Sequence, residues 1–191
     1  MKLVFATNNS NKLKEVQTLL PKSITLLSLQ DIGCLEDIPE TQPTIEGNAI
    51  QKASYIKEHY GYDCFADDTG LEVKTLNNEP GVYSARYAGE QRDANDNMSK
   101  LLYKLENATN RSAQFKTVIA LSVKNEIIAF TGICKGYITK EKKGEKGFGY
   151  DPIFQPNGYT KTFAQMDLDL KNEIGHRGKA IKQLVSLLNK Y

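Results

Sequence analysis

At 191 residues the chain has the length of one ordinary domain, and we expect a single domain over residues 1–191. Its 25 Lys and Arg residues nearly balance 23 Asp and Glu residues, and a net charge of +2 argues against non-specific nucleic-acid binding. The 40% hydrophobic and 25% charged fractions are those of a folded globular protein, neither disordered nor embedded in a membrane.

The cysteines and the apolar runs indicate where such a protein works. Cys34, Cys64 and Cys134 are widely separated, and with only two histidines in the chain they argue against a zinc site. We expect all three thiols to be buried in a reducing compartment. The first apolar run is too short for a signal peptide, and residues 117–123 fall far short of the roughly 20 that span a membrane. The sequence therefore predicts a cytoplasmic protein without a membrane span.

The chain begins with alternating strand and helix patterns. Residues 3–6 form a short apolar run that suits a buried strand. From Ser10 onward, apolar residues recur at helical spacing, and Pro21 should end this first helix. Residues 23–29 have the composition of a second strand.

A second helix and an acidic turn are expected next. Apolar residues recur every three or four positions from Ile45 until Gly61 supplies a C-terminal stop. Two short strands, at residues 64–66 and 71–73, are separated by the acidic segment 67–70, which we interpret as a turn. Acidic side chains are therefore expected at the end of a strand.

A third helix precedes a run of strands. Asp93 can cap this helix, and the apolar residues between positions 98 and 105 form its core face. Successive strands are expected at residues 114–123, 127–131 and 133–139, the first two joined by a tight turn at Lys124 and Asn125. This order of strands indicates a meander.

The last part of the chain is rich in glycine and then helical. The glycine-rich segment 144–158 leads to a final helix with apolar residues at positions 180–188. No internal repeat or linker interrupts the chain. Helices that alternate with strands, together with consecutive strands, predict an α/β fold with a mixed sheet.

A polar segment joins the first strand to the first helix. Free N–H groups and the positive end of the helix dipole attract anions at such a junction, so a phosphate cradle is one interpretation. The spacing of a P-loop is absent, and the alternative is that Asn9 or Ser10 only caps the helix. The residues of this segment are Thr7, Asn8, Asn9, Ser10, Asn11 and Lys12.

Acidic residues form a second candidate group. Asp67 and Asp68 follow a predicted strand, with Glu36, Glu40 and Glu46 upstream. Mg²⁺ prefers carboxylate oxygens and keeps several waters, so two or three of these acids could hold it beside a triphosphate. The alternative is that the aspartates belong to an Asx-turn followed by a type II turn.

A third candidate group centres on an aromatic ring. Gly147 and Gly149 flank Phe148, so the backbone can approach a ligand closely and the faces of the ring stay open to a base. Asp151 could accept hydrogen bonds from the N–H groups of that base. The alternative is a loop whose aromatic side chains fill the core.

Cationic side chains gather just before the last helix. Lys171, His176, Arg177 and Lys179 offer donors for phosphate or carbonyl oxygens. The alternative is a solvated charged surface, which is the usual place of Lys and Arg. A histidine between glycine and arginine is not expected in a core.

Short motifs run in order along almost the whole chain. They are Thr7-x-Asn9-x-x-Lys12, Glu40-Thr41 with Thr44 and Asn48-Ala49, Ala66-Asp67-Asp68-Thr69-Gly70-Leu71, Pro80-Gly81-Val82-Tyr83-Ser84-Ala85-Arg86-Tyr87, Gly147-Phe148-Gly149-Tyr150-Asp151-Pro152 and His176-Arg177-Gly178-Lys179-Ala180. Together they resemble the inosine/xanthosine triphosphatase family, the pyrophosphatases of non-canonical purine nucleoside triphosphates. Two positions depart from the family pattern: Gly175 stands where Ser is usual and Gln42 where Gly is usual.

The resemblance implies Mg²⁺-dependent hydrolysis of ITP, XTP and dITP between the α and β phosphates, which gives the monophosphate and pyrophosphate. It implies that Asp68 is the general base and that Glu40 and Asp68 bind the metal ion. We expect no covalent nucleophile, and activity should rise with pH as the base ionises. The implied substrate-binding residues are Thr7, Asn8, Asn9, Ser10, Asn11, Lys12, Lys52 and Thr69 toward the triphosphate, and Phe148, Gly149, Tyr150, Asp151, Lys171, His176 and Arg177 toward the nucleoside.

The resemblance also implies an architecture and a partner. Family members have a long mixed sheet with two lobes around a central active-site cleft, and they are homodimers with the segment that matches residues 84–87 near the interface or the cleft. Two other functions remain open: a related pyrophosphatase for modified pyrimidine or standard nucleotides, and a nucleotide sensor without activity. The presence of both Glu40 and Asp68 argues against the sensor.

Overall fold

The computed structural model describes residues 1–124 and 126–190, and the chain forms two compact units. Unit 1 comprises Met1–Asp68, Thr117–Gly132 and the chain from Arg177 onward, and unit 2 comprises Thr69–Lys116 and Ile133–His176. The expectation of a single domain over the whole chain stays a prediction.

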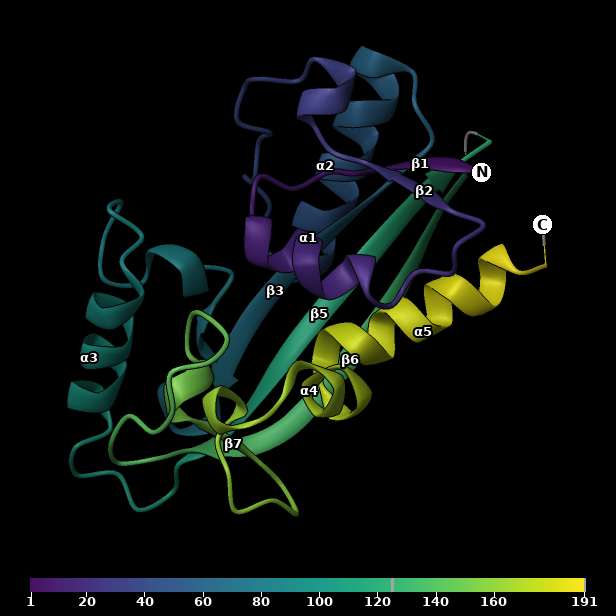
Figure 1. Ribbon diagram of the computed structural model, residues 1–191. Coiled ribbons are helices and arrows are strands. Elements are labelled where there is room, and N and C mark those ends of the chain that lie inside the picture. Colours follow the sequence, from purple (N-terminus) through teal and green to yellow (C-terminus); the bar gives the residue numbers. More distant parts are fainter. Residues whose placement is uncertain (125, 191) are drawn as a thin grey trace. The chain divides into compact units, whose positions relative to one another are not determined.

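The strands, in chain order, are β1 (Lys2–Phe5), β2 (Thr25–Leu27), β3 (Cys64–Val73), β4 (Glu79–Gly81), β5 (Ser112–Val123), β6 (Glu126–Ile138) and β7 (Phe154–Pro156) (Figure 1). They pair in the order β2-β1-β3-β5-β6-β7, with β4 on β3. β1 is parallel to β2 and β3, whereas β4 is antiparallel to β3 and β7 is antiparallel to β6. The predicted α/β fold with a mixed sheet is confirmed.

The α-helices are α1 (Ser10–Gln17), α2 (Ile45–Tyr60), α3 (Ala94–Lys104), α4 (Leu168–Ile174) and α5 (His176–Leu188). The predicted signals at two of their ends are confirmed. The Asp93 side chain accepts a hydrogen bond from the Asp96 N–H at the start of α3, and Gly61 ends α2 in the left-handed conformation at φ +72°. Among the described residues, no helix has the length and apolar character needed to span a membrane.

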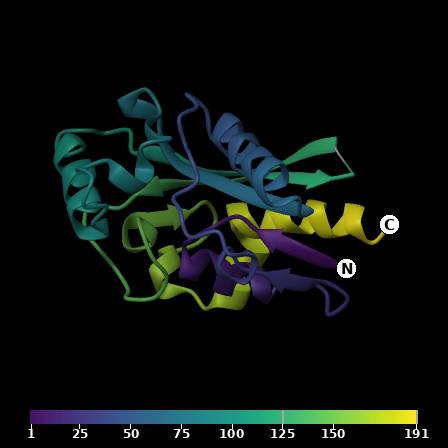
Figure 2. The same ribbon diagram turned by 90° about the horizontal axis from the view of Figure 1, so that it is seen from above.

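In unit 1 helices cover both faces of the sheet (Figures 1 and 2). Side chains of one face, such as Leu3 and Phe65, form a core with Val16 of α1 and Ile181 of α5. On the other face α2 packs against β3, where the Cys64 thiol donates to the carbonyl oxygen of Ala53 at 3.2 Å. Successive residues of a strand point to opposite faces, so β3 sends alternate side chains toward α1 and α5 or toward α2.

Unit 2 has a separate core that is rich in aromatic rings. Met98 and Leu101 of α3 belong to this core, as the spacing of the helix predicts. Phe115, Phe154 and Phe163 pack together, with ring centroids 4.7–6.0 Å apart. The cysteines Cys34, Cys64 and Cys134 of the two units are buried and carry no disulfide, as expected.

The predicted turn at residues 67–70 is wrong. β3 runs without interruption from Cys64 to Val73, so the two short strands expected here are one strand and the Asx-turn alternative is excluded. The strand β3 pairs with β1 at residues 64–65, with β4 at residues 71–73, and with β5, and these ladders bind its backbone groups. This pairing holds Asp and Gly residues in an extended conformation although their local preference is for turns.

Other differences concern element boundaries. The strands expected at residues 127–131 and 133–139 are the single strand β6, because one intervening glycine is too short to reverse the chain. α1 ends at Gln17, since in a helix that continued to Pro21 the proline ring would collide with the carbonyl group of Gln17. The strand expected at residues 23–29 shrinks to β2, and β4, β7 and α4 are too short for periodicity to predict. The expected turn at Lys124 and Asn125 lies partly outside the described residues.

Candidate active site

Two adjacent aspartates of β3 lie on opposite faces of the sheet in unit 1. Asp67 falls in the alternation with Phe65 and points toward α1 and α5, where it contacts Lys12 and Arg177. Asp68 points toward α2, where it contacts Asn48. The continuous strand therefore gives the two carboxylates different surroundings.

Asp67 is the acceptor of a buried ionic cluster. Its side chain is 1% exposed, and it accepts from Lys12 Nζ at 3.0 Å and from Arg177 Nε and Nη2 at 3.3 Å. A further Arg177 nitrogen donates to Glu15 of α1. Burial alone would raise the pKa of Asp67, but Lys12 and Arg177 outweigh it and hold that pKa well below its usual range. Asp67 is therefore a permanent anion that fixes both cations.

Asp68 is buried beside fewer compensating charges. Asn48 Nδ2 donates to its Oδ2 at 3.2 Å. Burial raises the pKa of Asp68, the negative charge of Glu40 raises it further, and the cations Lys52 and Lys12 offset only part of this increase. A carboxyl group with a raised pKa in a polar site is suited to exchange a proton.

Lys52 of α2 connects the acidic residues. Its Nζ donates to a Glu40 carboxylate oxygen and, at 2.7 Å, to the backbone oxygen of Asp67. Burial by itself lowers the pKa of Lys52, but the carboxylates of Glu40, Asp68 and Asp67 outweigh burial and raise it. Burial lowers the pKa of Lys12 despite the nearby Asp67. Unit 1 thus brings together the buried Lys52, the half-buried Lys12, Glu40 and Asp68, and the roles expected for them stay predictions.

The polar segment before α1 is a helix cap in this structure. Asn9 Oδ1 accepts from the N–H groups of Asn11 and Lys12 at 3.0 and 3.2 Å, and Thr7 Oγ1 accepts from the Asn9 N–H at 3.2 Å. The capping alternative is confirmed for Asn9, whereas the phosphate cradle stays a prediction. The neighbouring positions Asn8, Ser10 and Asn11 are exposed, and Thr69 begins unit 2 and is half-buried.

The other acids of the predicted group lie apart from this arrangement. Glu36 accepts hydrogen bonds from the hydroxyl groups of Tyr55 and Tyr60 at 3.0 and 2.6 Å, and Glu46 is exposed in the first turn of α2. Among residues 1–124 and 126–190, no three His, Cys, Asp or Glu side chains form a group that could hold a metal ion. A metal site at Glu40 and Asp68 would therefore rely on two protein carboxylates.

A second group of predicted site residues lies in unit 2. Asp151 is 3% exposed, and its Oδ2 accepts from the Phe148 N–H at 2.9 Å and from Lys171 Nζ at 2.6 Å. Lys171 Nζ lies 4.8 Å from the centroid of the Phe148 ring, within the range of a cation–π interaction. The expectation that both ring faces are open is therefore wrong, because Lys171 lies over the half-buried ring. Gly149 takes a positive φ of +61° next to it.

Several other side chains of unit 2 belong to its core. The Tyr150 hydroxyl donates to the Ser84 backbone oxygen at 2.8 Å, so the core-filling alternative is confirmed for this ring. The His176 ring is buried and stacks on Phe115 with centroids 4.5 Å apart. The expectation that His176 lies outside a core is wrong. The solvated-surface alternative is wrong as well for Lys171, His176 and Arg177, which are all buried.

The sequence predicts no role for two residues of this arrangement. Glu15, which binds Arg177, and Asn48, which binds Asp68, are both buried. The sequence marks Asp67 as one acid of a candidate group, but its ionic partners Lys12 and Arg177 are 55 and 110 residues away in the chain. No local pattern marks such long-range pairs.

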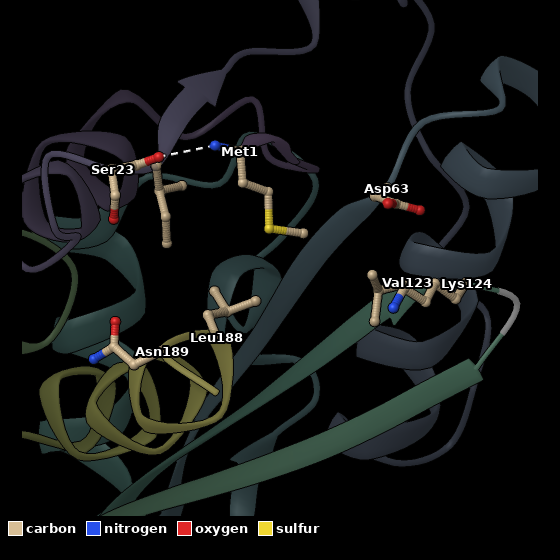
Figure 3. Close-up of a pocket in the computed structure, with 8 residues that line it drawn as sticks. Met1, Ser23, Asp63, Val123, Lys124, Leu188 and Asn189 are labelled. Carbon is tan, nitrogen blue, oxygen red and sulfur yellow. Dashed lines mark hydrogen bonds between the residues drawn. The ribbon is translucent and has the colours of Figure 1, made fainter. Parts of the chain in front are cut away.

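A pocket of about 530 Å³ lies elsewhere in unit 1 (Figure 3). It is lined by Met1, Ser23, Ile24, Asp63, Val123, Lys124, Leu188 and Asn189. Met1 and Asp63 precede the parallel strands β1 and β3, whereas Thr7 lies beyond the carboxyl end of β1 and Asp67 lies just past residues 64–65, the part of β3 that pairs with β1. Ligands of α/β sheets bind at the carboxyl ends of parallel strands, so this pocket is distinct from the candidate active site.

Comparisons with known proteins identify relatives that match over almost the whole chain. The sequence matches the Ham1 family over residues 3–187. It is 66% identical over 188 residues to the dITP/XTP pyrophosphatase of Flavobacterium johnsoniae, covering 98% of both chains. It is 58% identical over 190 residues to the dITP/XTP pyrophosphatase of Christiangramia forsetii, covering 100% of both.

Solved structures show the same fold. The Staphylococcus aureus Ham1 protein matches with a TM-score of 0.91 and 41% identity, over 100% of this chain and 99% of that one. A HAM1 protein from Coxiella burnetii matches with a TM-score of 0.92 and 38% identity, over 100% of both chains.

The buried Arg177 cluster generates a stability prediction. We expect Arg177→Ala to lower the free energy of unfolding by about 3 kcal/mol, because it leaves two buried carboxylates without their shared cation. Urea denaturation at pH 7 measures the loss. Lys179→Ala, an exposed change on the same helix, is the control and should stay within about 0.5 kcal/mol of the parent. A loss as small for Arg177 as for Lys179 contradicts the prediction.

Proposed function

This chain belongs to the Ham1 family, and we propose that it is a pyrophosphatase that converts dITP, XTP and ITP to the monophosphate and pyrophosphate. The observation that carries this proposal is the arrangement of Glu40 and Asp68 with Lys12 and Lys52 in unit 1. Its support from the comparisons is that curated relatives named dITP/XTP pyrophosphatase match over the full chain. By removing such nucleotides, the protein cleanses the nucleotide pool.

We assign the metal site to Glu40 and Asp68, with Mg²⁺ as the ion. Both ligands are hard oxygen donors, and Mg²⁺ commonly takes one or two carboxylates together with water and substrate phosphates. The charge of Glu40 raises the pKa of Asp68, which is the mutual repulsion that a cation would relieve. When bound, Mg²⁺ neutralises phosphate charge and favours the ionised form of its carboxylate ligands.

The residues of unit 1 then have separate roles in hydrolysis. Asp68 takes the proton of the attacking water, the anhydride between the α and β phosphates breaks, and pyrophosphate leaves. Lys12 and Lys52 neutralise the phosphate oxygens, and Thr7 and Asn9 supply further donors, as does Thr69, the first residue of unit 2. Because Asp68 must be ionised to act as a base, activity rises with pH.

The residues of unit 2 recognise the base. Phe148 offers the ring for stacking, while Asp151 and Lys171 place an acceptor and a cation beside it. Hypoxanthine and xanthine present O6 and N1–H, whereas adenine presents a 6-amino donor and a bare N1, so a donor–acceptor pair of this kind disfavours adenine. The expected contacts of His176 and Arg177 with the base stay predictions.

Two further properties are proposed from the family resemblance. The protein is a homodimer, with residues 84–87 near the interface or the active site. It works in the cytoplasm, where its substrates arise in the nucleotide pool. Sedimentation of the purified protein tests the dimer.

Pyrophosphate release from a panel of nucleotides tests the proposed function. We expect dITP, XTP and ITP to be hydrolysed with kcat/KM at least about 100-fold above ATP and dTTP. Adenine mismatches both polar positions, and thymine, although it presents O4 and N3–H, lacks the second ring of a purine. GTP is included because guanine shares O6 and N1–H with the substrates. Equal activity on ATP or dTTP favours the pyrophosphatase of standard or pyrimidine nucleotides. Binding of dITP without pyrophosphate release favours the sensor.

Asp68→Asn tests the general base. We expect kcat with dITP to fall by roughly 10²–10⁴, because the amide neither accepts the proton nor binds the metal ion well. Steady-state kinetics give the value, and thermal unfolding shows whether the variant is folded. A folded variant within a few-fold of the parent removes Asp68 from the mechanism.

Lys12→Ala tests the phosphate side. We expect the KM for dITP to rise at least about tenfold while the affinity for inosine stays within about twofold, because the cation acts on charge that the nucleoside lacks. Kinetics with dITP and calorimetry with inosine separate the two ligands. Equal losses for both indicate that Lys12 is only structural.

A further inference from the structure

The segment that carries Glu40 is fastened along α2. Residues 33–44 contain no helix or strand, so side chains rather than a backbone ladder determine where Glu40 lies. Gln51 binds this segment at Thr41 through two hydrogen bonds of 2.9 Å. Its Oε1 accepts from the backbone N–H of Thr41, and its Nε2 donates to the Thr41 hydroxyl oxygen. Lys52 binds Glu40 itself. We call residues 33–44 the Glu40 segment.

The Glu40 segment also lies directly on the first turn of α2. A Cβ atom at Gly47 would be 2.7 Å from the Cβ atom of Gln42 and 3.0 Å from Thr44 Oγ1. Only a residue without a side chain fits there while Gln42 keeps this place. The close approach brings the Gln42 backbone N–H to the Asn48 side chain, which accepts it at 2.9 Å.

The Asn48 carboxamide joins the Glu40 segment to Asp68. The side chain is 2% exposed, and its Nδ2 donates to Asp68 Oδ2 at 3.2 Å while its Oδ1 accepts from Gln42. The orientation of the amide is determined by chemistry, because a backbone N–H can only donate and a carboxylate oxygen can only accept. A flipped amide would lose both bonds. One buried group therefore fixes the distance between two chain segments that carry functional carboxylates.

We propose that Asn48 is a positioning residue for this reaction. It orients the Asp68 carboxylate and holds the Glu40 segment in a fixed place relative to that carboxylate. The inference rests on the proposed function, in which Asp68 is the base. A base acts only when its oxygen lies within hydrogen-bond reach of the proton it takes, so the orientation of the carboxylate limits the rate. Asn48 touches no reacting atom and acts through Asp68.

Gln51 provides a matched control on the same helix. It binds the same segment through two bonds, but its hydrogen-bond partner is Thr41 and not Asp68. If Asn48 served only to fasten the Glu40 segment, losing either carboxamide would have similar effects. If Asn48 acts through Asp68, the two losses differ.

The experiment compares Asn48→Asp, Asn48→Leu and Gln51→Leu in steady-state hydrolysis of dITP. Asn48→Asp keeps an oxygen for the Gln42 N–H but places an acceptor against Asp68, and Asn48→Leu removes both bonds at similar volume. We expect kcat to fall about 10–100-fold for both Asn48 variants, with KM within about threefold, which is the effect typical of residues that orient a functional ligand. Gln51→Leu should lower kcat by less than about threefold.

A second measurement needs neither metal nor substrate. The side-chain amide signals of Asn48 in a nitrogen–proton NMR spectrum of the metal-free protein should shift in Asp68→Asn, because their acceptor is replaced, and should stay in place in Gln51→Leu. This measurement tests the hydrogen bond between Asn48 and Asp68 even if thermal denaturation shows that both Asn48 variants are unfolded.

The outcomes separate this inference from the proposed function. If the parent protein releases no pyrophosphate from any nucleotide of the panel, the proposed function fails. If the parent is active and Asn48→Asp stays within about threefold of its kcat, the inference is overturned. It is equally overturned if Gln51→Leu lowers kcat as much as Asn48→Leu does, or if the Asn48 amide signals do not shift in Asp68→Asn.

Discussion

The unbroken course of β3 through Asp67 and Asp68 is the constraint on which the site depends. In an extended strand neighbouring side chains point to opposite faces, so two identical residues meet different partners. Asp67 meets Lys12 and Arg177, and its pKa is lowered; Asp68 meets Asn48, and burial raises its pKa. One aspartate thus becomes a fixed anion and the other a group that can exchange protons.

The ionic cluster at Asp67 contributes more to positioning side chains than to the free energy of unfolding. Buried ion pairs gain little net free energy over apolar packing, because desolvation cancels much of the attraction. The cluster joins α1, β3 and α5, since Arg177 of α5 binds Glu15 of α1 and Asp67 of β3, while Lys12 of α1 binds Asp67 as well. In the proposed function Lys12 binds phosphate, and a lysine held in this way already has its position before the phosphate arrives, so little ordering remains for the binding step.

The sequence predicts those parts of the fold that local chemistry determines. The spacing of α2 with its stop at Gly61 and the Asp93 cap of α3 can be read from a few neighbouring residues. The turn assigned to residues 67–70 fails because flanking strands override local preference. The sequence does not predict the burial of Arg177 and His176 for a related reason: their partners Asp67 and Phe115 are distant in sequence. Motifs point to the residues of the candidate site, and only the fold shows which of them form ion pairs.

Both departures from the family pattern lie at points of close approach. Gln42 packs its Cβ atom over Gly47, next to the residue that binds Asp68. At Gly175 a Cβ atom would lie 2.4 Å from the carbonyl oxygen of Lys171, which accepts the Gly175 N–H at 2.8 Å. A serine at position 175 therefore requires the last turn of α4 to shift, and Lys171 would shift with it relative to Asp151. Neither Gln42 nor Gly175 is among the proposed substrate-binding residues, so both departures act through backbone placement, one beside Asn48 and the other beside Lys171.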